Sequence, residues 1–512
     1  MRTRRLIGFA AAAALTTLTG LGGLGGLGVG ASTAPAASDA VIRFQWGTPA
    51  GSNYDPHTAF NQFANIYLYP AYDRLMDLTS EGEVVPMLAE SWEFTESDTV
   101  LRLVLREGVV FHDGEAFDAE SVKANIERGK TVEASAVVAD LASVDEVVVV
   151  DERTVELHLS SPGSSLPALL ADRAGMMVSP AAFDNEDLDL MPVGAGAYQV
   201  VEHTPGSVIS FERFADYWDP AAQTLGGVEL TMQLDPEARL RAVIDGQADG
   251  TSLNSDQATA ATDAGLVVST APTTGAFLLF VNMAKPGLDT LEVRRAISLA
   301  IDRQGIAEAL HAGLCTPTNS IFPATYWAGT DSIPVDEVDL DTARSLLDEA
   351  GYGEGLDLSA VVVNVPFYVA QLEALQAMLG EIGINLTVTA LEPTELLSRF
   401  ATGEADLYFT QYPGSVDPAK TVASIFATEA TLNPGQYSNA ELDELAGQGL
   451  SVIDQAERAP IYQELAAVAA ADYFHIPVCS PDGVWAMTES VGNLVPTLGG
   501  SVDFRGVTLA GP

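Results

Sequence analysis

The residues of this chain that are capable of chemistry do not form a catalytic set. There is no G-x-S-x-G nucleophile elbow, no Walker A phosphate loop and no H-E-x-x-H zinc motif. The six histidines are scattered without the spacing of metal ligands. Carboxylate pairs are frequent, but 70 acidic residues make accidental pairs unavoidable. We therefore expect no enzyme activity, no catalytic residue, no metal ion and no cofactor.

A stretch in the C-terminal half predicts where a ligand would bind. Strand-like apolar segments alternate there with segments that carry apolar residues at helical spacing, at residues 358–363, 368–382, 386–390, 393–400 and 405–410. This β-α-β-α-β order predicts a parallel sheet with right-handed crossovers. Ligands of open α/β sheets lie beyond the carboxyl ends of strands, so a site is expected in the loop 411–418.

The most informative stretch spans residues 88–128. An alternating strand around Leu101–Arg106 is followed by a turn, a strand-like run at Val109–Phe111 and another turn. Asp118 is placed as the N-cap of a helix that runs to Arg128. The order R-E-G-V-V-F-H-D-G, then F-D-A-E-S-V, resembles the K/R-x-G-V-x-F-H-D-G and F-x-A-x-D-V signature of the peptide/nickel family of solute-binding proteins, which feed ABC transporters.

Further segments resemble the same family in the correct order. They include P-V-G-A-G-A-Y at residues 192–198, F-E-R-F-A-D-Y-W-D at 211–219 and V-R-R-A-I-S-L-A-I-D-R at 293–303. The resemblance runs from about Arg43 to Pro496. The chain thus resembles the family 5 extracellular solute-binding proteins, a group that includes dipeptide- and oligopeptide-binding proteins.

This resemblance implies an α/β fold of the periplasmic-binding-protein-like type II (cluster C). Such a fold has two large lobes, an inserted smaller lobe and a ligand buried in the interlobe cleft, with hinges expected here near Asn282 and Pro481. The implied division is a signal peptide at 1–40, lobe I at 41–74, 191–281 and 482–512, lobe II at 75–190, and lobe III at 282–481.

The first group of ligand-binding residues implied by the resemblance is Phe63, Ala64 and Asn65. In the family, residues at this place contact the ligand backbone, at the start of a helix-like segment that covers Phe63–Met76 here. A core aromatic residue and a helix cap explain the same residues equally well.

The second implied group is Gln411, Tyr412, Gly414 and Asp417. Peptide-binding members carry an aspartate four residues before the proline of this loop, and it pairs with the α-ammonium of the ligand. Here that position is Gly414. Asp417 either takes over this role or serves only the turn before Pro418.

Two further expectations concern the segment 288–313. Asp289 and Glu292 form a D-x-x-E pattern that predicts a capped helix start. Arg294 and Arg295 of this helix either meet a ligand carboxylate or, the interpretation we favour, face solvent or form a structural ion pair.

The first 40 residues predict export from the cytoplasm. Three arginines precede the apolar run Leu6–Leu15, and Ala34–Ala36 offers a cleavage site. Sec and twin-arginine export both stay open. No cysteine precedes Cys315, so there is no lipobox for a lipid anchor, and we expect a periplasmic or extracellular protein.

Charge and cysteine content limit the partners and the redox state. The net charge of −46 repels nucleic acid and anionic lipid, so neither is an expected partner. Cys315 and Cys479 are the only cysteines, and in an exported chain we expect them to form a disulfide. Two buried free thiols are the alternative.

From the resemblance we expect a monomeric binding protein. It would close over a small solute, a peptide or another metabolite, and deliver it to ABC permease subunits that work with ATPases. A secreted sensor on the same scaffold, without transport, is the alternative. The glycine at position 414 favours a ligand without a free amine over an ordinary peptide.

Overall fold

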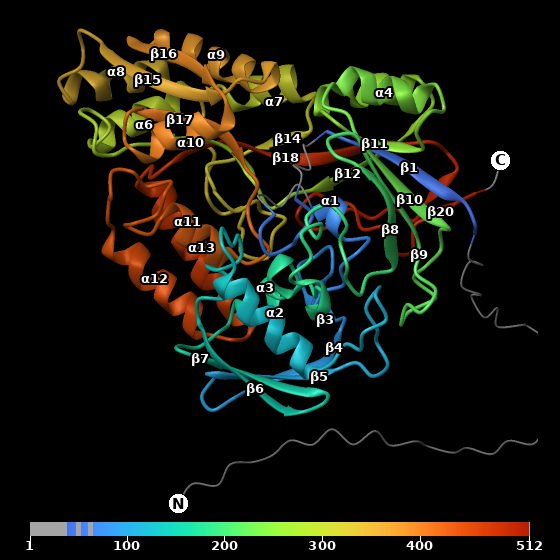
Figure 1. Cartoon of the computed structure of the whole chain (residues 1–512). Coiled ribbons are helices and arrows are strands. Elements are labelled where there is room, and N and C mark those ends of the chain that lie inside the picture. The colour runs from blue at the N-terminus through green and yellow to red at the C-terminus, as the bar shows by residue number, and fades with distance from the viewer. Residues whose placement is uncertain (1–37, 48–52, 60–64, 511–512) are drawn as a thin grey trace, which may run out of the picture. The chain divides into compact units, whose positions relative to one another are not determined.

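The structure is a computed structural model that describes residues 38–47, 53–59 and 65–510 (Figure 1). Most of the predicted signal peptide lies outside the described residues, as do the candidate ligand-binding residues Phe63 and Ala64. The described residues all belong to one compact unit. None of their helices is long and apolar enough to cross a membrane.

A twelve-stranded mixed sheet organises the described part of the chain. Its strands follow the order β16-β15-β17-β13-β18-β11-β1-β10-β9-β8, and β12 and β14 also pair with β18. The strands are β1 (Val41–Trp46), β8 (Tyr198–Thr204), β9 (Val208–Arg213), β10 (Gly227–Met232), β11 (Gly250–Leu253), β12 (Val267–Pro272), β13 (Ala276–Val281), β14 (Cys315–Pro317), β15 (Leu356–Val363), β16 (Ile384–Leu391), β17 (Leu407–Tyr412) and β18 (Ile476–Met487).

Strand β18 belongs to both halves of this sheet. Its first half pairs with β13 and β14, where Cys479 lies opposite Phe277. Its second half pairs with β11 and β12, where Val484 lies opposite Leu253. One continuous strand therefore carries the chain across the junction near Pro481, where the sequence predicted a crossover.

The pairing of β15, β16 and β17 confirms the predicted parallel arrangement. β15 pairs in parallel with both neighbours, and α9 (Pro366–Gly380) and α10 (Pro393–Ala401) make the connections. The buried face of α9 includes Leu372, Leu375 and Leu379, which accounts for their helical spacing. The other helices of this half are α6 (Leu291–Ala300), α7 (Arg303–His311), α8 (Leu340–Glu349), α11 (Pro418–Ile425), α12 (Ala440–Ser451) and α13 (Gln455–Ala471).

A separate four-stranded sheet lies within the predicted lobe II. Its order is β4-β5-β7-β6, and α2 (Ala119–Thr131) packs against it (Figure 1). Asp118 caps α2 as predicted, since its side chain accepts from Ser121 N at 2.8 Å. The strands are β4 (Ala89–Thr95), β5 (Val100–Leu105), β6 (Val144–Asp151) and β7 (Thr154–Leu159).

The remaining elements are short, and among them β2 pairs with β3 and β19 pairs with β20 in two small sheets. The helices are α1 (Asn65–Leu68), α3 (Leu166–Leu169), α4 (Pro236–Ile244) and α5 (Ala258–Asp263), with 3-10 turns at Arg173–Gly175, Pro180–Ala182 and Ser255–Gln257. The strands are β2 (Met76–Leu78), β3 (Val84–Pro86), β19 (Val491–Gly492) and β20 (Thr508–Leu509).

The described residues form three large hydrophobic cores. One draws on residues 276–479 and one on residues 75–195. The third combines residues from three separate stretches, at 42–72, 176–230 and 485–507. Strand β13 pairs with β17, and its residues 276–281 belong to the first core.

The predicted helix at Phe63–Met76 and the predicted strand at Val109–Phe111 are much reduced. Among the described residues, α1 covers only Asn65–Leu68, because Pro70 follows and the chain turns there. Of the expected strand only an isolated bridge forms, between Val110 and Ala116.

The predicted cap of α6 is wrong, whereas the structural interpretation of its first arginine is confirmed. The helix begins at Leu291, and Asp289 Oδ1 instead accepts from Gly287 N. Arg294 is buried and pairs with Asp472 at 2.9 Å. Its guanidinium is therefore not available to a ligand carboxylate.

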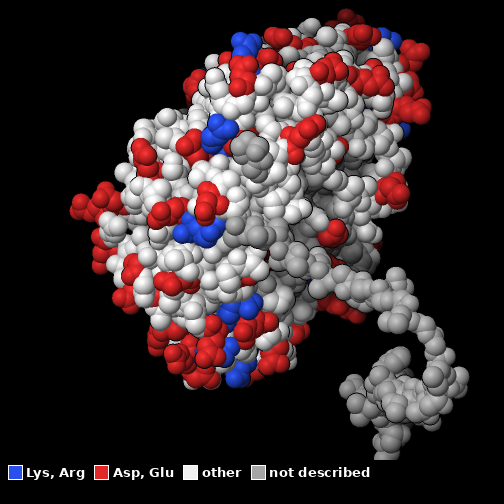
Figure 2. All heavy atoms as spheres, turned by 90° about the vertical axis from the view of Figure 1, so that its right-hand side faces the viewer, with Lys and Arg blue, Asp and Glu red and all other residues white. Residues whose placement is uncertain are grey.

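Acidic side chains dominate the surface of the described residues. On the face shown in Figure 2 they are spread over the whole surface, and the few basic side chains lie beside acidic ones. This distribution offers no basic patch on that face for nucleic acid or anionic lipid.

Candidate functional site

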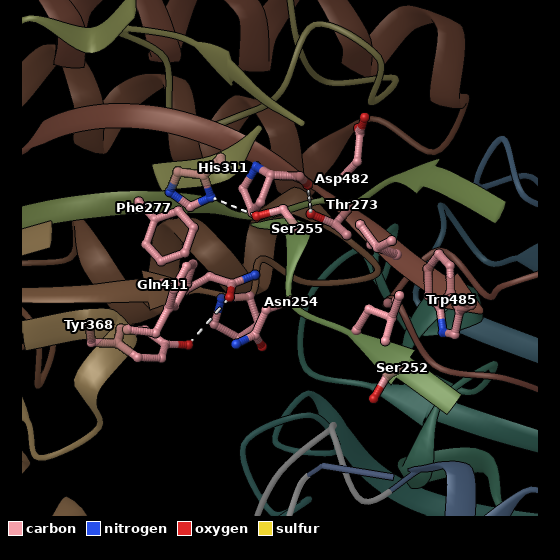
Figure 3. A pocket seen from close by; sticks show the side chains of 18 of the residues that line it. Ser252, Asn254, Ser255, Thr273, Phe277, His311, Tyr368, Gln411, Asp482 and Trp485 are labelled. Atoms are coloured by element: carbon pink, nitrogen blue, oxygen red, sulfur yellow. Dashed lines mark hydrogen bonds between the residues drawn. The ribbon is translucent and has the colours of Figure 1, made fainter. Parts of the chain in front are cut away.

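A cavity of about 190 Å³ lies between the two halves of the large sheet (Figure 3). This volume lies below the roughly 300–1,000 Å³ of typical ligand pockets, so the cavity as it stands fits only a small solute. Its wall includes aromatic and polar side chains from segments far apart in the chain, among them Trp46, Asn254, Ser255, Tyr368, Gln411 and Trp485. Of the seven ligand-binding residues predicted from the sequence, Gln411 lines this cavity.

Strand ends position much of this wall. Trp46 is the last residue of β1, Asn254 follows β11, and these two strands are parallel neighbours. The rule that directed attention to the loop after β17 applies equally to β1 and β11, and it would have found both residues. His311, the last residue of α7, also lines the cavity but carried no such signal.

The described wall of the cavity is polar and nearly free of charge. It contains no lysine or arginine, and Asp482 is its one carboxylate. Burial raises the pKa of Asp482, and in Figure 3 its carboxyl points away from Asn254 and Gln411. Burial also lowers the pKa of His311, so this imidazole is neutral at pH 7. The cavity thus offers aromatic rings and uncharged hydrogen-bonding groups.

Gly414 has a backbone conformation that excludes an aspartate. Its φ is +76°, in the left-handed region that favours glycine. A Cβ added there would lie 2.2 Å from the carbonyl oxygen of Thr274, closer than any van der Waals contact. The loop as folded therefore has no room for the ammonium-binding carboxylate of peptide-binding members.

Asp417 is committed to the interior of the protein. Both of its carboxylate oxygens accept from Arg458, each at 2.8 Å, and both side chains are buried. The carboxylate also caps α11 by accepting from Ala419 N at 2.9 Å. Asp417 does not line the cavity, and its charge is already neutralised.

Asn65 lines a second, smaller cavity. Its amide nitrogen donates to Asp172 at 2.8 Å and to the Tyr69 hydroxyl at 3.2 Å. Its side-chain oxygen is buried and has no hydrogen-bond partner among the described residues. Tyr412, in contrast, packs edge-on against Phe280, at 6.2 Å between ring centroids, and lies outside both cavities.

Cys315 and Cys479 form a disulfide, which joins β14 to β18 beside the cavity. Together with His311 they are the one group of potential metal ligands found among the described residues, with ligand atoms within 4.8 Å of one another. Both sulfurs are used by the disulfide, so the group as it stands is not a thiolate metal site.

The sequence matches a known protein family and individual relatives. Residues 83–433 match the family described as bacterial extracellular solute-binding proteins, family 5 Middle. The glutathione-binding protein GsiB of Escherichia coli (strain K12) is 27% identical over 455 residues, which cover 85% of this chain and 87% of that protein.

Solved structures show the same fold. NikA from Brucella suis, in complex with Fe(III)-EDTA, matches with a TM-score of 0.83 and 23% identity, covering 91% of this chain and 99% of that chain. DppA from Helicobacter pylori, in complex with the peptide STSA, matches with a TM-score of 0.81 and 22% identity, covering 92% and 98%. The fold is that of the type II periplasmic binding proteins. Because the family match covers well over half of its length, the chain belongs to family 5 of the bacterial extracellular solute-binding proteins.

Proposed function

We propose that the protein captures an uncharged polar solute outside the cytoplasm and delivers it to an ABC permease driven by ATPases. The observation that carries this proposal is the wall of the cavity, where aromatic rings and neutral polar groups stand without a lysine or arginine. The protein would act as a monomer, and the lobes would close over the solute.

The loop after β17 supports a ligand without a free amine. Gly414 leaves no space for a carboxylate, and Asp417 is already paired with Arg458. A peptide ammonium in this cavity would lack the charge-assisted hydrogen bond that is typically worth about 1.5–3 kcal/mol, or roughly ten- to a hundredfold in affinity. The ammonium would also lose its hydration without compensation.

Calorimetric titration of two matched ligand sets tests this proposal. Free di- to pentapeptides are compared with the same peptides blocked at the amine and the carboxylate, beside uncharged sugars. We expect the uncharged ligands to bind at least tenfold more tightly than the free peptides. Tight binding of free peptides that is lost on N-acetylation would refute the proposed ligand class.

Asp482 is the residue to vary in this experiment, since it is the one carboxylate in the described wall. Asp482→Asn should leave binding of uncharged ligands within about twofold of the wild type. If free peptides bind and Asp482→Asn abolishes their binding, then Asp482 is the amine anchor and the solute carries a free amine.

A sensor without transport remains the second candidate function. It would share the cavity and the ligand, and would differ only in its partner. Uptake of the radiolabelled ligand by cells with and without this protein separates the two, because only a transport component changes the rate of uptake.

A further inference from the structure

We infer that Ser255 is a fixed hydrogen-bond acceptor for the solute, held in that state by His311 and Gln371, and that the cavity takes a hydroxyl-rich uncharged solute such as a saccharide. This inference rests on the proposed function, because it assigns the chemistry of the same cavity. The three side chains are joined by hydrogen bonds from Gln371 through His311 to Ser255, which lines the cavity. Figure 3 shows the bond between His311 and Ser255.

The orientation of the side-chain amide of Gln371 decides which atom donates in each of these hydrogen bonds. Its Nε2 donates to the carbonyl oxygen of Phe367 at 3.4 Å, which leaves Oε1 facing His311 Nε2 at 2.9 Å. The reversed amide would set two oxygens, Gln371 Oε1 and Phe367 O, against each other. His311 therefore carries its proton on Nε2, and its Nδ1 accepts from Ser255 Oγ at 3.2 Å.

Ser255 consequently has no proton left for a ligand. A hydroxyl has one proton and two lone pairs, and here the proton lies in the bond to His311. Ser255 is 7% exposed and the other two residues are 1% exposed, so water does not compete for these bonds. The rings of Phe277 and Phe367 hold the imidazole, with centroids 4.9 and 5.3 Å from it.

A second hydroxyl of the cavity is fixed in the same state. Thr273 donates its proton to the carbonyl oxygen of Pro481 at 2.8 Å (Figure 3). The Thr273 hydroxyl can therefore only accept a hydrogen bond from a ligand. The solute must therefore bring hydrogen-bond donors to at least two places in the wall.

The amide groups of the wall are fixed as donors. The side-chain oxygen of Asn254 accepts from Gln257 N, and Gln411 Oε1 accepts from the Tyr368 hydroxyl at 3.4 Å. Both amides therefore keep their N–H groups for a ligand. Trp485 adds a buried indole N–H that has no partner among the described residues.

Because the wall holds both fixed acceptors and fixed donors, it favours a solute that can donate and accept hydrogen bonds. A hydroxyl group donates and accepts at a single atom, whereas each polar atom of a capped peptide does only one of the two. Aromatic rings such as Trp46 and Tyr368 supply flat apolar faces for the C–H surfaces of a sugar ring. A hydroxyl-rich ring therefore fits this wall better than a peptide does.

The first test reads the proton on His311 directly. Nitrogen–proton correlation spectra of the ¹⁵N-histidine-labelled protein report which ring nitrogen is protonated, and His311→Gln identifies the signal. We expect the Nε2–H form at pH 7 in the wild type, and a shift toward a tautomer mixture in Gln371→Leu. A dominant Nδ1–H form in the wild type would overturn the inference, whatever the ligand.

The second test measures affinity for cellobiose, maltose, lactose and sucrose, beside N-acetyl dipeptide amides. We expect at least one disaccharide to bind, and Ser255→Ala to weaken that binding about threefold to tenfold. Ser345→Ala, which removes an exposed hydroxyl on α8 far from the cavity wall, serves as the matched control and should bind like the wild type.

The outcomes separate this inference from the proposed function. Disaccharide binding that Ser255→Ala leaves unchanged would overturn the role of Ser255 only. Binding of the dipeptide amides alone would overturn the hydroxyl-rich solute and leave an uncharged solute standing. If no uncharged ligand binds while free peptides do, the proposed function fails as well.

Discussion

Asp417 and Arg458 form a buried ion pair that fixes the loop after β17. Each carboxylate oxygen of Asp417 accepts one guanidinium hydrogen bond at 2.8 Å, and Arg458 also stacks near Tyr462 and Trp327. The partner lies 41 residues away in the sequence. The turn chemistry of Asp417 was readable from its neighbour Pro418, but the ion pair was not, because it exists only once α13 packs against the loop.

Breaking this pair should destabilise the protein strongly. Asp417→Asn leaves a buried guanidinium without its counter-charge, which typically costs about 3–5 kcal/mol. Urea denaturation measures the change. Arg344→Met removes an exposed pair with Asp341 and should cost less than about 1 kcal/mol. If both variants lose the same free energy of unfolding, the buried pair contributes no more to stability than an exposed pair does.

A second buried cluster should make stability depend on acid pH. Burial alone would raise the pKa of Asp503, but Arg505 and Arg74 outweigh it and lower the pKa to about 2. A carboxylate whose pKa is depressed on folding stabilises the protein above its unfolded pKa near 4, and this contribution is lost as the pH falls toward 2.

Asp503→Asn isolates that contribution. At pH 6 the variant should be less stable than the wild type by about 2–3 kcal/mol. The difference should shrink as the pH falls from 4 to 2, because the wild-type carboxylate becomes protonated there. Urea midpoints at pH 6, 4, 3 and 2.5 provide the comparison. A difference that stays constant over this range would assign the effect to packing instead of charge.

At the scale of elements, the sequence was most informative where periodicity and capping act locally. The β15-α9-β16-α10-β17 order and the Asp118 cap were readable because they depend on neighbours within a few residues. The hydrogen bonds from Ser255 through His311 to Gln371 could not be predicted from the sequence. The bonded residues lie 56 and 60 positions apart. Only the folded arrangement brings the three side chains together, beside the cavity that Ser255 and His311 line.

The length of strand β18 could not be predicted from the sequence for a different reason. It contains Pro477 and Pro481, which argue against a central strand because proline cannot donate to the ladder. Pro477 pairs with Leu278 of β13, and the register of this pairing shifts between Phe277 and Leu278. The ladder is irregular at this point, so the strand tolerates a proline there. The length of β18, and hence its role in joining both halves of the sheet, was for this reason not predictable.

The disulfide should stabilise this junction. It closes a sequence separation of 164 residues between β14 and β18, which the chain-entropy model values at about 5 kcal/mol or less. We expect the double variant Cys315→Ser, Cys479→Ser to unfold at lower urea concentration, and reduction of the wild type to have the same effect. Thiol titration of the unreduced, denatured wild type should find no free thiol, and two thiols would contradict the bond.

At the scale of the whole molecule, contacts join the predicted lobes II and III. Lys420 pairs with Asp140 at 2.7 Å, and the Ser164 hydroxyl donates to the carbonyl oxygens of Gly449 and Leu450 at 3.2 and 3.0 Å. The proposed function has the lobes close over the solute. These contacts are of the kind that would hold a closed form.

Closure itself predicts a change in solution size. Small-angle scattering of the wild type should give a smaller radius of gyration with a saturating ligand from the uncharged panel than without it. An unchanged radius with ligand bound, as shown by calorimetry on the same sample, would mean that the lobes do not move on binding.

Lys420→Ala tests whether the contact between lobes favours the closed form. Asp140 is 8% exposed, so removal of Lys420 leaves a buried carboxylate without its partner, and burial already raises the pKa of this carboxyl. The contact should be worth about 1 kcal/mol, so the variant should bind ligand about fivefold more weakly and need more ligand to become compact.

Lys285→Ala is the matched control, because its lysine is similarly exposed and pairs with Asp406 within lobe III. If both variants bind and compact like the wild type, the pair between Lys420 and Asp140 does not contribute to closure.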